Sequence, residues 1–105
     1  SELDFVYQKA SQALQALNDA MDTLVAATWV KTGFRYDPQA VAAKKGKVFL
    51  NNVEQSTYVT TALIDAATFP EDEEMTLAIG LKNGEATATT LRIDWFGLAQ
   101  EKVPD

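Results

Sequence analysis

The densest cluster of groups that could do chemistry is the acidic run Glu71-Asp72-Glu73-Glu74, with Asp65 upstream of it. Calcium loops place their oxygen ligands at alternating positions around a glycine. This run is contiguous and has no glycine, so we predict no metal site here. Most such runs are solvated loops, and the less common alternative is a docking site for a basic partner. The possible partner-binding residues are therefore Asp65, Glu71, Asp72, Glu73 and Glu74.

A second charged motif, Lys44-Lys45-Gly46-Lys47, has the lysine and glycine of a nucleotide phosphate-binding loop. The earlier glycine and the following Ser or Thr of that pattern are both absent. The motif therefore does not predict nucleotide binding. As a local basic patch, it could offset the acidic loop of a neighbouring copy.

Several enzyme chemistries are excluded because the chain has no cysteine and no histidine. Without them it has no thiol nucleophile, no disulfide, and neither the commonest general base nor the commonest transition-metal ligand. A pair of carboxylates of the glycosidase type would need a cleft, which 105 residues without a glycine-rich loop disfavour. We predict that the protein is not an enzyme and has no catalytic, cofactor-binding or metal-binding residues.

The net charge of −6, from 15 acidic and 9 basic residues, opposes binding to nucleic acid and to anionic membranes. No apolar run reaches transmembrane length, and no secretory signal opens the chain. We therefore predict neither a nucleic-acid partner nor a membrane partner. A soluble protein in the cytoplasm or in a virion or other particle is expected, although a removed export signal would leave no trace.

The elements that would position these groups begin with residues 1–28, which carry the strongest helical signal. Apolar residues recur at spacings of three and four without an interrupting glycine or proline: Leu3, Val6, Ala10, Ala13, Leu17, Ala20, Leu24 and Ala27. We predict a long amphipathic helix. Its small side chains would let another layer approach closely, either the protein's own sheet or the same helix of another copy.

Alternating apolar residues over 29–36 predict a strand. A short helix over 38–45 should follow, with Asp37 as its cap and Gly46 ending it in a left-handed conformation. A brief strand over 47–50 then leads to a hairpin turn at Asn51-Asn52.

The β-branched residues over 55–64 predict the next strand, although 63–69 could equally begin a helical turn. The clearest hairpin joins 75–81 to 85–98. A three-residue loop with Gly84 at positive φ sets Met75 opposite Leu91 and unites the large apolar residues on one face.

The other face of that hairpin holds small residues, which also suit close packing. Together with the helix stripe they make the predicted interface: Ala10, Ala13, Leu17, Ala20, Ala27, Ala78, Gly80, Ala86 and Ala88.

Aromatic residues on the expected strands belong by default to the core: Trp29, Tyr36, Tyr58, Trp95 and Phe96. Trp95 and Phe96 are adjacent on a strand and must point to opposite faces, so at least one of them leaves the main core face. An exposed aromatic strip would instead suit stacking against sugar rings.

The predicted architecture is an α+β single domain over residues 1–105. The helix over 1–28 precedes an antiparallel region of about five strands over 29–99, and the polar residues 100–105 fray. The favoured function is a non-enzymatic structural or assembly protein, such as a virion or tail component, that forms a homo-oligomer or packs with other protein subunits. The alternatives are a small acidic binding module or inhibitor of a basic partner, and a carbohydrate-binding domain.

Overall fold

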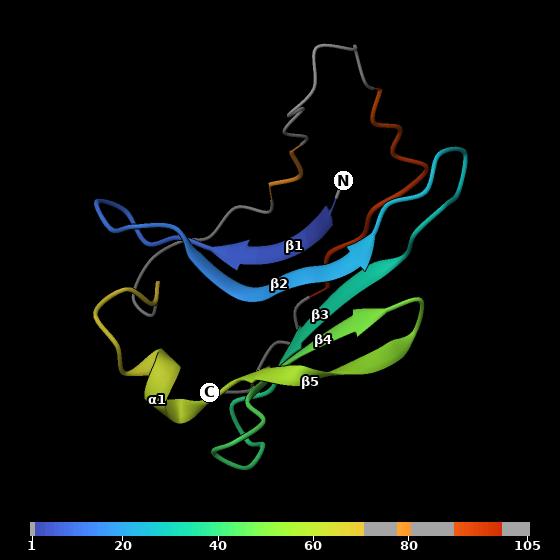
Figure 1. The fold of residues 1–105 in the computed structure, drawn as a ribbon. Helices are drawn as coiled ribbons and strands as arrows, with labels where there is room; N and C mark the ends of the chain where they lie inside the picture. Colours follow the sequence, from blue (N-terminus) through green and yellow to red (C-terminus); the bar gives the residue numbers. More distant parts are fainter. Residues whose placement is uncertain (1, 71–77, 81–89, 100–105) are drawn as a thin grey trace. The chain divides into compact units, whose positions relative to one another are not determined.

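The computed structural model describes residues 2–70, 78–80 and 90–99. The chain divides into two compact units, Ser1–Met75 and Thr76–Asp105, which are described separately. In the part of the chain that the structure describes, all helices and strands belong to the first unit (Figure 1).

The first unit begins with two antiparallel strands, β1 (Glu2–Tyr7) and β2 (Gln15–Thr23). Along β1, the half-buried residues Leu3, Phe5 and Tyr7 alternate with exposed ones, so the strand has one inner and one outer face. The register shifts twice, between Leu3 and Phe5 and between Phe5 and Val6. These irregularities bend the pair away from an ideal ladder.

The long helix predicted over residues 1–28 is therefore wrong, and with it the α+β class: the described structure is mostly strands. Leu3 and Val6, placed on one helical face by their spacing, lie on opposite faces of β1. Contacts with distant residues explain the difference, since tertiary packing overrides local helix propensity. Phe5 stacks on Phe34 with ring centroids 5.1 Å apart, and Tyr7 meets Phe69 edge-on at 5.3 Å.

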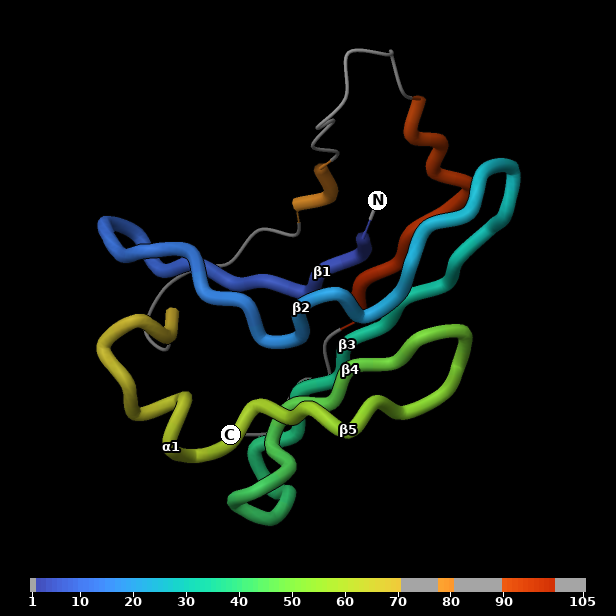
Figure 2. Tube along the Cα trace, in the orientation of Figure 1, coloured from blue at the N-terminus to red at the C-terminus, as the bar shows by residue number. Residues whose placement is uncertain are grey.

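The second sheet has three antiparallel strands in the order β3-β4-β5: β3 (Thr32–Tyr36), β4 (Gly46–Leu50) and β5 (Val53–Val59). Figure 2 traces the chain from β2 through a long connection into β3. The strands predicted over 29–36 and 47–50 are confirmed as β3 and β4 with shifted ends. The strand predicted over 55–64 is confirmed only to Val59.

The turn predicted at Asn51-Asn52 is confirmed. Leu50 pairs with Val53, which leaves two residues in the loop, and Asn51 and Asn52 have φ angles of 50° and 68°. Two successive positive φ angles characterise the type I′ turn, whose twist matches that of a hairpin.

The short helix predicted over 38–45 is wrong, because this connection consists of turns. The amide of Asp37 donates to the carbonyl of Lys45 at 2.8 Å, which closes the loop, and the Asp37 carboxylate accepts from the amide of Gln39 at 2.9 Å. Asp37 therefore organises a turn instead of capping a helix. Gly46 is not left-handed either and begins β4.

One short helix follows β5, α1 (Thr61–Ile64), where the side chain of Thr60 accepts from the amide of Leu63 at 3.3 Å. The helical alternative predicted for residues 63–69 thus starts earlier, at Thr61. No helix in the described ranges is long and apolar enough to cross a membrane.

The core of the first unit is small. Among the described residues its buried hydrophobic members are Leu17 of β2, Val48 of β4 and Val59 of β5. Partly buried residues from β1, β2, α1 and the segment after α1 pack against these three: Phe5, Tyr7, Met21, Leu63, Ile64 and Phe69.

In the second unit, the described residues 78–80 and 90–99 form no strand, against the hairpin predicted over 75–81 and 85–98. Met75 and Gly84 lie outside the described residues, so the turn and register predicted for that hairpin stay predictions.

Candidate functional site

The predicted interface of small residues does not form one face in the first unit, because the helix that would align them is absent. Leu17 is buried in the core. Ala10 and Ala13 lie in the exposed connection between β1 and β2. Ala20 in β2 and Ala27 in the next loop are exposed and have positive φ angles.

Of the other residues predicted for the interface and for partner binding, the structure describes only some. Ala78 and Gly80 are exposed, whereas Ala86 and Ala88 lie outside the described residues. Asp65 is exposed at the end of α1, and its amide donates to the carbonyl of Thr61. The acidic residues Glu71, Asp72, Glu73 and Glu74 also lie outside the described residues, so no convergence of these acids with Asp65 can be described.

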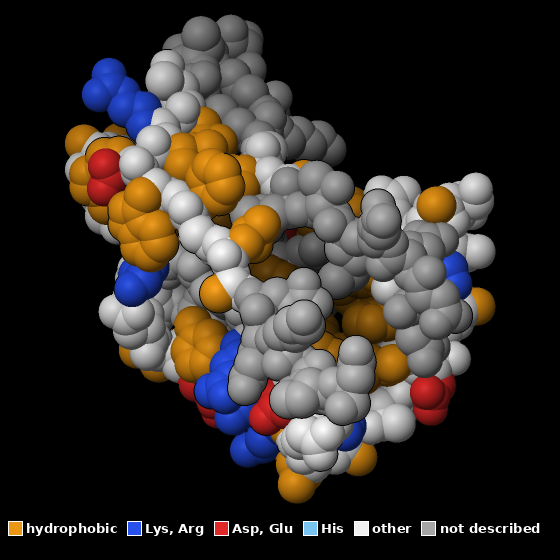
Figure 3. Space-filling view, turned by 180° about the vertical axis from the view of Figure 1, so that it is seen from behind, with side chains coloured by type: hydrophobic (Ala, Val, Ile, Leu, Met, Phe, Trp, Pro, Cys, Tyr) orange, Lys and Arg blue, Asp and Glu red, His pale blue; other side chains and the backbone are white. Residues whose placement is uncertain are grey.

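Large apolar side chains lie at the surface among the described residues (Figure 3). Trp29 is 66% exposed and Tyr36 is 47% exposed, so two aromatic residues assigned by default to the core are not buried. Phe34 keeps 43% of its surface exposed despite its stacking on Phe5. In the second unit Trp95 and Phe96 are both exposed, which agrees with the prediction that at least one of them leaves the main core face.

A charged network on β4 and β5 is a feature that the sequence alone did not reveal. The Tyr58 hydroxyl donates to the Glu54 carboxylate at 2.7 Å, and the ammonium of Lys47 lies 3.3 Å from the same carboxylate. The bond from Tyr58, helped by Lys47, lowers the pKa of Glu54. The same bond raises the pKa of Tyr58, because ionising the phenol would destroy it.

Beside this network, the loop from β3 to β4 encloses a pocket of about 60 Å³. Its lining includes the three lysines of the basic motif predicted as a local patch. The full lining is Arg35, Asp37, Ala40, Lys44, Lys45 and Lys47, of which Arg35 belongs to β3. Four cations around one pocket create a positive local potential in a protein whose net charge is −6.

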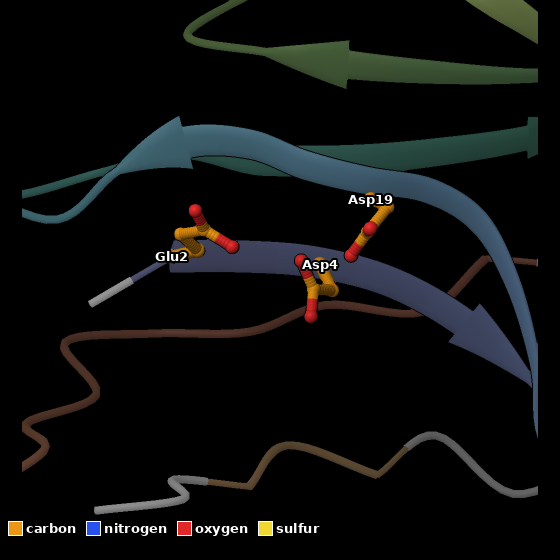
Figure 4. A group of neighbouring side chains, drawn as sticks. All are labelled: Glu2, Asp4 and Asp19. Atoms are coloured by element: carbon orange, nitrogen blue, oxygen red, sulfur yellow. The ribbon is translucent and has the colours of Figure 1, made fainter. Parts of the chain in front are cut away.

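Three acidic residues also converge on the outer face of the first sheet. Glu2 and Asp4 of β1 and Asp19 of β2 can each offer one carboxylate oxygen within 4.8 Å of the others (Figure 4). All three are exposed, and one Asp4 oxygen already accepts from the amide of Ala20 at 2.7 Å. Calcium takes six to eight oxygen ligands, so these carboxylates would supply only part of a coordination shell.

No family model matches the sequence, and no match was found among curated proteins or among solved structures.

Proposed function

We propose that the chain is a non-enzymatic assembly protein that packs through apolar surfaces against further copies of itself. The distribution of apolar side chains is the observation that carries this proposal. Among the described residues, three hydrophobic side chains are buried, while fourteen large hydrophobic ones are exposed. Monomeric soluble proteins expose isolated apolar residues, but larger apolar surfaces usually mark interfaces.

The small core supports the proposal energetically. Each Å² of apolar surface removed from water contributes roughly 25 cal/mol, so a core built on Leu17, Val48 and Val59 stabilises the first unit only modestly. Small domains often obtain the missing stability from oligomerisation. Burying Trp29 and Tyr36 against another subunit would supply such area.

Strand edges support the same function. In the described residues, β3 and β5 each pair only with β4, so both present an edge. Unpaired edge strands are templates for pairing with another chain. The edge strand β3 also carries Phe34 and Tyr36, and Trp29 lies just before it. We name these three residues the aromatic edge and propose it as the main assembly surface.

Light scattering coupled to size-exclusion chromatography tests the proposal. The wild-type protein should exceed its monomer mass of 11.5 kDa as concentration rises through the micromolar range. Trp29→Ser should weaken association without loss of the fold, because Trp29 is already mostly exposed. Val41→Ser is the matched control, since Val41 is 68% exposed but lies in the loop between β3 and β4.

A wild-type protein that stays monomeric at high micromolar concentration would overturn the assembly function and favour the alternative of an acidic binding module. Equal weakening of association by Trp29→Ser and Val41→Ser would contradict the aromatic edge as the main surface.

A further inference from the structure

The pocket between β3 and β4 has the dimensions of a site for one small charged group. Its volume of about 60 Å³ lies well below the roughly 300–1,000 Å³ of sites for drug-sized ligands. Its lining holds four basic residues and one acidic residue, Asp37.

The sheet register brings two of the cations together. Arg35 of β3 lies directly opposite Lys47 of β4, and like charges in directly opposed positions destabilise a sheet. Lys47 is compensated by Glu54 of β5, whose carboxylate lies 3.3 Å from the Lys47 ammonium. Arg35 has no carboxylate partner among the described residues, so the repulsion between Arg35 and Lys47 is only partly relieved.

The neighbouring lysines are held in place by other contacts. The Lys45 ammonium donates to the carbonyl of Pro38 at 2.6 Å. The Lys44 ammonium lies 5.0 Å from the centre of the Tyr58 ring, within the range of a cation–π contact. The Asp37 carboxylate is engaged by the amide of Gln39. A ligand that enters the pocket thus meets cations that are already positioned, which reduces the entropic cost of binding.

We propose that this pocket is an oxyanion-binding site that takes one carboxylate or phosphate group. Arg35 is the principal donor, because its planar guanidinium can bind two oxygens at once. Lys44 and Lys45 contribute positive potential from the loop. A bound anion would also relieve the repulsion between Arg35 and Lys47. The two sources of such a group are free phosphate and the acidic side chains of a polypeptide.

The test is a titration of the dilute, ¹⁵N-labelled protein with inorganic phosphate at constant ionic strength, followed by NMR. We expect saturable shifts of the backbone amides of residues 35–47. Arg35→Gln should raise the dissociation constant about tenfold or more, as expected for loss of a charged hydrogen bond. The control Arg92→Gln makes the same change of charge at an exposed position in the second unit and should leave the constant unchanged.

A peptide containing Glu-Asp-Glu-Glu provides the second arm. Shifts of the same amides at lower concentration than phosphate would identify polypeptide carboxylates as the preferred source, and the reverse order would identify phosphate. If Arg35→Gln does not fold, Lys44→Gln takes its place. Equal phosphate responses in the wild type and the folded pocket variant would overturn the proposal, and so would equal responses to chloride and phosphate.

Discussion

A Cβ atom placed on Gly46 would lie 2.7 Å from the Cβ of Val59, its partner across the ladder between β4 and β5. Real Cβ atoms essentially never approach so closely, so the absence of a side chain at Gly46 allows Val59 to enter the core. The ring of Phe34, 3.2 Å from the same position, closes the space from β3.

The first prediction concerns this contact. Gly46→Ala should reduce the free energy of unfolding by about 1–3 kcal/mol, because overpacking forces the backbone or Val59 to move. Gly33→Ala is the control, since its Cβ would make an ordinary 3.6 Å contact with Phe49 and alanine is preferred to glycine in a strand by about 0.5–1 kcal/mol. Urea unfolding measures both variants. Equal stability of the two would show that the contact at Gly46 imposes no constraint.

The second prediction concerns the register shift in the first sheet. Asp4→Ala should destabilise the protein by about 0.5–1 kcal/mol, because it removes the acceptor for the amide of Ala20. Asp19→Ala removes a nearby exposed carboxylate and should have a smaller effect. Thermal unfolding of the two variants provides the comparison. A larger loss in Asp19→Ala would contradict the role assigned to Asp4.

The third prediction separates the two residues of the turn between β4 and β5. The side-chain oxygen of Asn51 accepts from the backbone amide of Lys31 at 3.0 Å. The backbone amide of Asn51 donates to the carbonyl of Lys31 at 2.7 Å. Glycine suits the positive φ angles of both positions. Asn52→Gly should therefore be neutral or stabilising, whereas Asn51→Gly should lose about 1 kcal/mol with its side-chain bond. Chemical unfolding decides, and a lower stability for Asn52→Gly would contradict this assignment.

The fourth prediction concerns the titration of Tyr58. Because the bond to Glu54 raises the pKa of Tyr58 above 10.0, Glu54→Gln should lower it toward that value. Glu2→Gln, an exposed acid on β1, should have no effect. Titration by NMR of the Tyr58 ring measures the pKa, and an unchanged value in Glu54→Gln would refute the coupling.

The same pair makes stability depend on pH in two separate ranges. The contribution of Tyr58 is fully present below pH 10.0 and is lost as pH rises through its raised pKa. The contribution of Glu54 is present above pH 4.5 and is lost as pH falls through its lowered pKa. Glu54 is exposed and Tyr58 is half-buried at the surface, so solvent screening keeps both effects small.

Local patterns were sufficient for part of the fold. The alternation over 29–36 identified β3, the brief apolar run over 47–50 identified β4, and Asn51 and Asn52 identified the turn from β4 to β5. These features depend on side-chain alternation and on backbone preference. The sequence identified Asp37 as a side chain that binds nearby amides. Whether it caps a helix or a turn depends on the residues after Gln39, and here the chain turns back so that the backbone amide of Asp37 binds the carbonyl of Lys45.

The N-terminal residues show where local patterns fail. Their alanine-rich stripe fits a helix, while Leu3, Phe5 and Tyr7 also fit a strand. The stacking of Phe5 on Phe34 and of Tyr7 on Phe69 favours the strand, and neither contact can be read from spacing within residues 1–28.

The candidate anion site divides in the same way. The basic patch at Lys44, Lys45 and Lys47 was evident from the sequence, because these residues are neighbours in the chain. Arg35 joins them only through the register of β3 against β4. Sequence by itself thus determined the short-range features, whose energies depend on adjacent residues. Tertiary structure decided the strand state of the N-terminus and the composition of the pocket, because both depend on contacts between residues far apart in the chain.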